Sequence, residues 1–284
     1  MKTKTNRRNF LLGSAGLAGL SISGSALAAA DTDSKSYDLK LGVASYSLRG
    51  FSRDVAIRMI KQLDTPYVNV KEFHLPYRDS EEDLRRGRKR FDEAGLIITG
   101  GGTISLQKDD EADIRRYFEY ARICGMPLMV VAPTRQTMPR IEKFVKEYNI
   151  RVAIHNHGPE DKHFPSPYEA LEVVQNMDPR VGLCLDVGHT MRTGVDVVKS
   201  IADAGSRLLD MHLKDLRGPK EKGSQCEVGK GAMPVVAIFQ QLKKMKFAGN
   251  VALEYEINED APLAGMKESF AYMRGVLDGL KGQA

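Results

Sequence analysis

The 284-residue chain has few of the features that mark small secreted, repetitive or membrane proteins. Its three cysteines, Cys124, Cys184 and Cys226, are too few for a disulfide framework, and none belongs to a CxxC pair. It has no low-complexity tract, no short-period repeat, and no apolar run of the roughly 20 residues that a membrane-spanning helix needs. With 42% hydrophobic and 28% charged residues, the composition is that of a folded globular protein with a sizeable core.

The first 30 residues have the pattern of a twin-arginine signal peptide. Arg7 and Arg8 precede an apolar run at residues 11–20, and residues 26–28 read Ala-Leu-Ala, which a signal peptidase could cut. A membrane anchor is the alternative, but the run is short and diluted by Gly and Ser. We therefore expect residues 1–30 to be removed during export by the twin-arginine machinery, leaving a periplasmic protein without a stable membrane anchor. Because such a leader is read by machinery that exports folded proteins, a metal could be selected before export.

The basic charge of the chain lies largely in this leader. The whole sequence has 42 Lys and Arg against 37 Asp and Glu, a net charge of +5. Four of the basic residues and none of the acidic ones lie in residues 1–30, which leaves 38 against 37 in residues 31–284. A chain so close to neutral lacks the basic surface typical of nucleic-acid binding, so we expect no nucleic-acid partner.

Short β-rich segments alternate with longer segments of helical period up to the C-terminus. Strands are expected at residues 39–44, 67–73, 96–100, 128–132, 151–156, 182–187, 208–213 and 250–255. Helices are expected at residues 54–62, 80–93, 111–125, 138–148, 167–176, 195–204, 234–245 and 264–280. Eight strand–helix units predict an α/β fold, a single (β/α)8 TIM barrel over residues 31–284. An open doubly wound sheet is the alternative, but no Gly-rich phosphate turn follows the first expected strand.

Polar side chains stand where the last four expected strands end. Because active sites of such barrels lie at the carboxyl ends of the strands, His155, Asp186, His212 and Glu254 should meet at one mouth. Taken alone, each has a structural explanation, and Asp186 could simply cap a turn that begins at Val187. Four successive strands ending this way instead predict one divalent metal ion. Imidazole and carboxylate ligands suit Mn2+ or Zn2+ best, with Co2+, Fe2+ or Mg2+ as further possibilities.

The strings IHNHG, LCLDVGH, HLKD and LEYE at these four strand ends resemble the xylose-isomerase-like TIM-barrel superfamily, in particular its sugar phosphate isomerase/epimerase members with a twin-arginine leader. The resemblance implies a metal held by Glu, Asp, His and Glu, and a carbohydrate substrate that is isomerised or epimerised through an enediolate-like intermediate. Asp186, His212 and Glu254 match that pattern, whereas His155 stands where the family usually has Glu. This departure puts the family's symmetric exchange of protons between two carboxylates in doubt.

The general base therefore has several candidates: His189, His157, Glu256 and Lys214. Histidine is favoured by an ordinary pKa near 6.5, close to the pH at which a base must act. His189 follows Asp186 by three residues, and it could equally well serve as a hydrogen-bonding support for a ligand. The reaction could be an isomerisation, an epimerisation or a β-elimination.

Substrate-binding candidates are Lys71, Glu72 and His74 after the second expected strand and Asp215 after the seventh. A salt-bridged rim is the alternative for Lys71, Glu72 and His74, and a pairing with Lys214 is the alternative for Asp215. Gly229 and Gly231 form a short Gly-Lys-Gly turn that could hold a phosphate through backbone N–H groups, although a plain turn explains it as well.

Alternatives to the isomerase remain open. One is a lyase or dehydratase on the same fold, similar to inosose dehydratases or 3-keto-glycoside lyases. Another is a non-catalytic sugar-binding barrel. Phosphodiester hydrolysis, as in abasic-site endonucleases of this fold, requires a cluster of several metals, and six histidines and a near-neutral charge argue against it.

Overall fold

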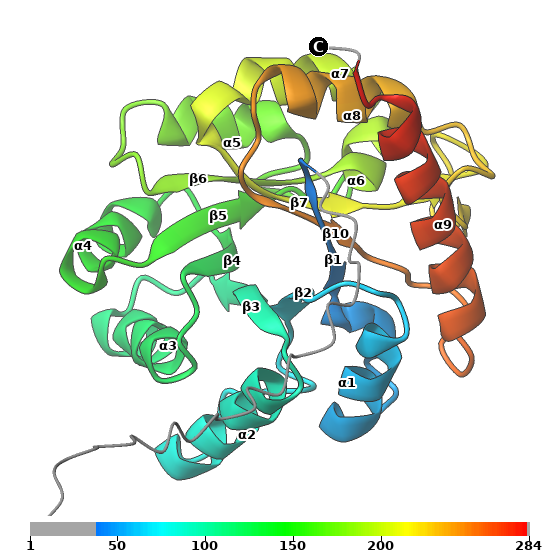
Figure 1. Cartoon of the computed structure of the whole chain (residues 1–284). Helices are drawn as coiled ribbons and strands as arrows, with labels where there is room; N and C mark the ends of the chain where they lie inside the picture. The colour runs from blue at the N-terminus through cyan, green and yellow to red at the C-terminus, as the bar shows by residue number, and fades with distance from the viewer. Residues whose placement is uncertain (1–37, 283–284) are drawn as a thin grey trace, which may run out of the picture. The chain divides into compact units, whose positions relative to one another are not determined.

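The computed structural model describes residues 38–282 and shows a closed parallel barrel of eight strands with helices packed around it (Figure 1). The order of strands around the barrel is β1, β2, β3, β4, β5, β6, β7 and β10, and every neighbouring pair is parallel. The (β/α)8 TIM barrel predicted from the sequence is therefore confirmed. The predicted signal peptide lies outside the described residues.

The strands of the barrel are β1 (Lys40–Ala44), β2 (Tyr67–Val70), β3 (Ile97–Leu106), β4 (Leu128–Pro133), β5 (Arg151–His155), β6 (Val181–Asp186), β7 (Leu208–Leu213) and β10 (Asn250–Leu253). The helices are α1 (Arg53–Lys61), α2 (Glu81–Glu93), α3 (Glu111–Ile123), α4 (Met138–Tyr148), α5 (Pro167–Val174), α6 (Val187–Arg192), α7 (Val197–Ala204), α8 (Val235–Lys244) and α9 (Leu263–Gly279). Two 3-10 turns, η1 (Ser45–Leu48) and η2 (Gly205–Arg207), and a small antiparallel pair, β8 (Asp215–Leu216) with β9 (Gln225–Cys226), complete the fold. None of the helices in the described part of the chain is long and apolar enough to cross a membrane.

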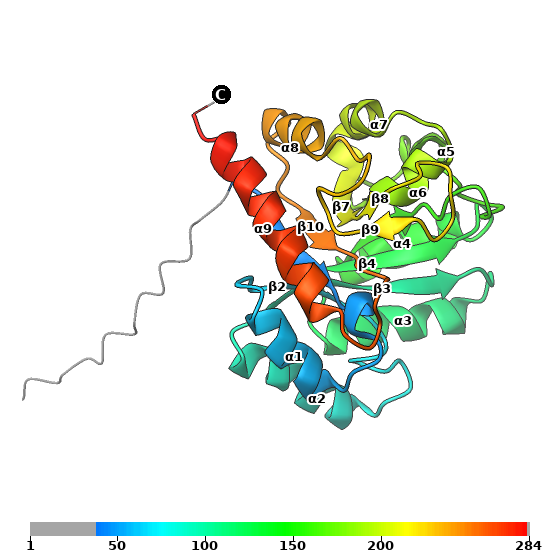
Figure 2. The same cartoon turned by 90° about the vertical axis from the view of Figure 1, so that its right-hand side faces the viewer.

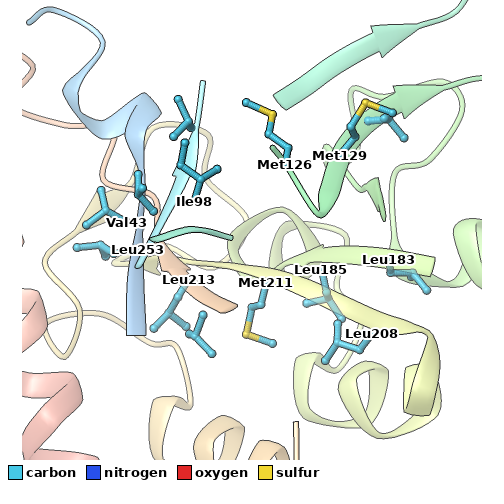
Figure 3. Close-up of a cluster of buried hydrophobic side chains, with 14 of the residues drawn as sticks. Val43, Ile98, Met126, Met129, Leu183, Leu185, Leu208, Met211, Leu213 and Leu253 are labelled. Carbon is cyan, nitrogen blue, oxygen red and sulfur yellow. The ribbon is translucent and has the colours of Figure 1, made fainter. Parts of the chain in front are cut away.

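The main hydrophobic core lies between the outside of the barrel and the helices. Figure 3 shows part of it, with Met211 and Leu213 of β7 beside Leu253 of β10. Because side chains of a strand alternate between its two faces, His212 must then point into the barrel. The same alternation turns Asp186 of β6 inward, because Leu185 belongs to the outer core. The apolar packing of the strands thus orients the polar side chains that end them.

Side-chain caps fix where several helices begin. Ser80 and Asp110 accept hydrogen bonds from the backbone N–H groups of Asp83 and Asp113, at the starts of α2 and α3. Ser166 and Glu169 form a capping box at the start of α5. These caps lie within one residue of the helix starts expected from the sequence.

Strand β3 is longer than the sequence predicts because of a bulge at its glycines. Its pairing with β4 shifts register between Gly101 and Ile104. Gly102 has a φ of +105°, and a Cβ there would lie 2.1 Å from the carbonyl oxygen of Val130, so only glycine fits. The bulge lets the strand continue to Leu106 instead of ending near Gly100.

Candidate metal centre and active site

Four side chains with metal-binding atoms meet inside the barrel at the carboxyl ends of its strands. His155 ends β5, Asp186 ends β6, His212 lies in β7, and Glu254 directly follows β10. All four are buried, and one ligand atom from each lies within 4.8 Å of the others. The convergence expected from the sequence is therefore present.

The distances within this cluster are short. His155 Nε2 lies 2.8 Å from His212 Nδ1 and 3.6 Å from Asp186 Oδ2. His212 Nδ1 lies 3.3 Å from Glu254 Oε2. Tetrahedral ligands bonded at about 2.0–2.2 Å stand roughly 3.3–3.6 Å apart, so most of these separations are close to those of a small divalent cation site.

Asp186 both caps a helix and faces the cluster. Its Oδ1 accepts the backbone N–H of His189 at 2.8 Å, which starts α6. Its own N–H donates to Asn156 Oδ1 at 2.9 Å, and the Asn156 amide group donates back to the Asp186 carbonyl. Asp186 Oδ2 is left buried without a hydrogen bond, although Lys214 Nζ lies 3.0 Å away. A buried carboxylate oxygen in that state fits a metal ligand.

Three of the four ligands, His155, Asp186 and Glu254, have the protonation states that a metal requires. Burial, with help from the neighbouring histidines, holds the pKa of His155 well below its ordinary value, so this imidazole is neutral. Burial alone would raise the pKa of both carboxylates. For Asp186 the neighbouring Lys214 outweighs burial, and for Glu254 His212 and Lys214 do so. The pKa values of Asp186 and Glu254 therefore lie well below the ordinary range. Neutral imidazoles and ionised carboxylates are the forms that bind metals.

Lys214 is the cation at the centre of this network. Its Nζ lies 3.0 Å from Asp186 Oδ2 and 2.9 Å from Glu254 Oε2, and it also donates to Glu256. Burial lowers the pKa of Lys214, but the three carboxylates raise it further, so the net pKa lies well above the ordinary value. An ammonium held this firmly serves as a hydrogen-bond donor rather than as the base that the sequence also suggested.

Lys71, which directly follows β2, also contacts the cluster. Its Nζ lies 3.4 Å from His212 Nε2 and 3.6 Å from Glu254 Oε1. A metal on His212 Nδ1 requires the proton to sit on Nε2, which leaves Glu254 Oε1 as the acceptor for Lys71. Lys71 thus stands among the polar groups of the mouth, as the sequence predicts.

Two further histidines lie beside the cluster and differ in their partners. The ring of His157 lies 4.3 Å from that of His155, and His157 Nδ1 is 3.2 Å from Asp161 Oδ2. The other oxygen of Asp161 accepts the N–H groups of His163 and Phe164, which fixes the carboxylate. Because a carboxylate only accepts, Asp161 favours the tautomer of His157 with the proton on Nδ1, which leaves the lone pair on Nε2. Burial lowers the pKa of His157, which keeps the ring neutral.

His189 has the reverse arrangement. Its Nδ1 lies 3.3 Å from a guanidinium nitrogen of Arg192, which can only donate. Nδ1 of His189 is therefore the acceptor, and a neutral ring carries its proton on Nε2. The rings of His157 and His189 lie 5.8 Å apart, so one neutral base and one hydrogen-bond donor stand side by side.

The remaining substrate-binding candidates lie away from the cluster. His74 is fully buried, its Nδ1 lies 3.0 Å from Ser45 Oγ, and burial lowers its pKa to about 4. Asp215 is also fully buried, and its oxygens accept four backbone N–H groups, those of Leu216, Gly229, Gly231 and Met233. These positions do not fit the substrate contacts suggested from the sequence. The Gly-Lys-Gly turn is a plain turn held by Asp215, so the N–H groups of its glycines do not face a phosphate site.

Glu72 is exposed, and it lines a pocket at the ends of β2 and β3. The Glu256 carboxylate accepts a hydrogen bond from the Lys214 ammonium, and the backbone N–H of Glu256 donates to Gln225 Oε1 at 2.8 Å. The side chain of Glu256 is partly exposed.

Asp161, Arg192 and Asn156 are residues of the site that the sequence argument did not single out. Asp161 follows His157 by four positions and Arg192 follows His189 by three. On α6 the second spacing places Arg192 on the same side as His189, which is the signal that could have identified it. The pairing of His157 with Asp161 depends on a loop, for which spacing alone gives no such rule.

The chain belongs to the xylose isomerase-like TIM barrel family, whose sequence pattern matches residues 57–276. No curated protein sequence matches it significantly. A D-psicose 3-epimerase crystallised in the presence of D-fructose is 18% identical, with a TM-score of 0.67 over 84% of this chain and 99% of that one. The IOLI protein with a bound zinc atom is 16% identical, with a TM-score of 0.73 over 86% and 100%. AsbF of Bacillus anthracis, described as a probable 3-DHS dehydratase, is 14% identical, with a TM-score of 0.68 over 83% and 99%. At these identities the likeness is one of fold.

Proposed function

We propose that the protein is a divalent-metal-dependent enzyme of the sugar isomerase/epimerase type, which removes a proton next to a carbonyl group of a sugar or sugar derivative. The observation that carries the proposal is the cluster of His155, Asp186, His212 and Glu254 at the mouth of the barrel. Two sugar 3-epimerases among the proteins of similar fold support the proposal, and so does the zinc atom bound in the IOLI protein.

The four side chains would hold the ion, and Zn2+ or Mn2+ suits two imidazoles and two carboxylates best. A bound divalent cation would supply Lewis-acid stabilisation of negative charge on a substrate oxygen. A dry, preorganised site strengthens this effect, and all four ligands are buried.

The residues around the ligands divide the work of proton transfer. His157, oriented by Asp161, presents the lone pair of Nε2 and is the base that we assign. His189, oriented by Arg192, presents its Nε2 proton and donates to a substrate oxygen. The ammonium groups of Lys71 and Lys214 stabilise the negative charge of an enediolate-like intermediate.

A lyase or dehydratase is the second candidate, and one observation favours it. The fifth strand ends in His155 rather than in a carboxylate, and this imidazole faces His212 and Asp186 within the cluster. A pair of carboxylates on opposite faces of the substrate is therefore missing, and one base, His157, stands on one side. A single base removes a proton efficiently, after which loss of a neighbouring hydroxyl or glycosyl group completes an elimination.

Proton NMR in D2O, on metal-loaded protein with a panel of ketoses, inososes and 3-keto-glycosides, tests both candidates. Deuterium incorporation without loss of water or glycosyl group supports the isomerase or epimerase, and appearance of an enone supports the lyase. Sugar binding that survives EDTA without any exchange would leave a non-catalytic sugar-binding protein and overturn the proposal.

His157→Gln identifies the base in the same assay. We expect a loss of exchange rate of about 100-fold or more, the usual contribution of a positioned base. His163→Gln is the matched control, because His163 lies in the same loop but is exposed and lines a different pocket. Equal rates in the two variants would exclude His157 as the base.

We also propose that the protein is exported through the twin-arginine route. The paired Arg7 and Arg8 before an apolar run support this. Replacement of both arginines by lysine should leave the protein in the cytoplasmic fraction, and unchanged periplasmic recovery would refute the route.

A further inference from the structure

A pocket of about 410 Å3 lies beside the proposed active site, between the loop after β2, the end of β3 and helix α3. This volume falls in the range of small-molecule sites, roughly 300–1,000 Å3. Figure 2 shows β3 running next to α3. Glu72 lines the pocket and directly follows Lys71, whose ammonium group lies among the ligands. Two consecutive residues after β2 thus contribute side chains to the centre and to the pocket.

The wall of this pocket is preformed. The bulge at Gly102 extends β3, so Ser105 reaches the pocket. On the other side, the ring of Tyr77 packs edge-to-face against those of Tyr117 and Tyr120, with centroids 5.3 and 5.1 Å apart. Tyr77 and Tyr117 line the pocket, and Tyr120 braces them from the core. Aromatic rings held in this way offer a flat apolar surface to a ligand at little entropic cost.

The polar groups of the pocket include a donor and an acceptor that are free to bind. Within residues 38–282, neither Glu72 nor Arg78 forms a side-chain hydrogen bond or an ion pair. Arg116, also in the lining, is paired with Asp113 at 2.7 Å. A free carboxylate and a free guanidinium in the lining of one pocket suit hydroxyl groups, which both donate and accept, whereas the carboxylate would repel a phosphate.

We propose that this pocket binds a second, uncharged glycosyl unit of the substrate, so that the enzyme acts on a glycoside of at least two units rather than on a free monosaccharide. The inference rests on the proposed function, because the first unit has to occupy the metal centre. Tyr117 supplies the stacking surface, and Glu72 and Arg78 bind neighbouring hydroxyl groups of the second unit.

Ligand-observed NMR titrations of the metal-loaded protein test the proposal, with cellobiose and trehalose as disaccharide probes and D-glucose as the monosaccharide. We expect at least one disaccharide to bind about tenfold more tightly than D-glucose, which corresponds to one good added interaction. Glu72→Gln and Arg78→Ala, both at exposed positions that do not threaten folding, should each remove most of that advantage and leave glucose binding unchanged.

Lys162→Ala is the matched control. Lys162 is exposed and lines a separate pocket of about 320 Å3 at the ends of β3, β4 and β5. Three outcomes would each overturn the proposed subsite. Disaccharides and glucose could bind equally, or the tighter binding of disaccharides could survive Glu72→Gln and Arg78→Ala. The third outcome is a loss of that tighter binding in Lys162→Ala.

The two proposals can fail separately. A disaccharide preference that depends on Glu72 and Arg78, in a protein without any proton exchange, would refute the proposed reaction and keep the subsite. Metal-dependent exchange on free monosaccharides, without a disaccharide preference, would refute the subsite and keep the reaction.

Discussion

Asp210→Asn should stabilise the protein at neutral pH. Asp210 is buried inside the barrel, two residues before His212, where Asn69 donates to its Oδ2 at 2.9 Å and its Oδ1 has no partner. Burial raises the pKa of Asp210 from 3.8 to about 6, although His212, Asn69 and Lys71 oppose the shift. The folded protein therefore holds the proton more tightly than the unfolded chain, and the free energy of unfolding falls as the pH rises from 3.8 to 6.

The magnitude follows from the shift. About two pH units at roughly 1.36 kcal/mol each give about 3 kcal/mol of stability lost above pH 6. An amide mimics the protonated acid without this cost, and Asn69 can offer its unpartnered Oδ1 after a flip of its side-chain amide. We expect the variant to be more stable than the original protein by about 3 kcal/mol at pH 8 and by about 1 kcal/mol at pH 4.5.

Urea unfolding in EDTA at these two pH values measures both differences. Asp92→Asn is the control, because Asp92 is an exposed partner of Arg88 and its loss should change stability by less than about 1 kcal/mol. A stability difference between Asp210→Asn and the original protein that does not change with pH, or a destabilised variant at pH 8, would refute the reasoning.

Three further variants test other parts of the structure. His74→Asn should reduce the loss of stability on acidification. Because burial lowers the pKa of His74 from 6.5 to about 4, the original protein loses up to about 3 kcal/mol of stability as the pH falls through that window. Urea unfolding at pH 7.5 and 4.5 measures this loss in both proteins. Asp215→Ala should destabilise the protein by about 3 kcal/mol or more, because the backbone N–H groups of Gly229 and Gly231 lose their acceptor. Limited proteolysis should then cut the loop between β8 and α8. No change in stability or in proteolysis would contradict the role of Asp215 in holding this loop. Lys214→Met should raise the affinity for Zn2+ by about tenfold, because it removes an ammonium that competes with the ion for Asp186 and Glu254. Competition with a chromophoric chelator measures the affinity. Weaker Zn2+ binding by the variant would show that Lys214 supports the ion instead.

Strand alternation explains which parts of the site the sequence could predict. Once Met211 and Leu213 are assigned to the outer core, His212 must point inward, and the same rule predicts Asp186. Beyond the end of β7 the same alternation distinguishes Lys214 from Asp215. The side chain of Lys214 points inward, like that of His212, and contacts the carboxylate of Asp186. The side chain of Asp215 points away from the barrel interior and accepts hydrogen bonds from the loop. Asp215 therefore holds the loop and does not contact the mouth, contrary to its prediction as a substrate-binding residue.

Other features depend on contacts that no pattern in one sequence reveals. Helix α6 has six residues, too few for a helical period, and it begins on the same Asp186 that ends β6. The extension of β3 to Leu106 depends on the close approach of Gly102 to Val130, which follows from the curvature of the barrel. The orientation of His157 depends on Asp161, whose carboxylate is set by the loop backbone at His163 and Phe164.

His155 stands where the resemblance to the family implies a fifth-strand carboxylate, and this difference in charge suits the anionic intermediate of the proposed reaction. Asp186, Glu254 and Glu256 carry three negative charges, and Lys71 and Lys214 carry two positive ones in contact with them. With Asp210 protonated, as it is below pH 6, this set has a net charge of −1. A divalent ion would change that charge to +1, and an enolate with one negative charge would then make the whole neutral. With glutamate in place of His155, the same intermediate would leave a net charge of −1 in a buried site, where unbalanced charge is costly. In the proposed reaction the imidazole thus removes one carboxylate as a base but would favour the anion that the proposed base, His157, forms.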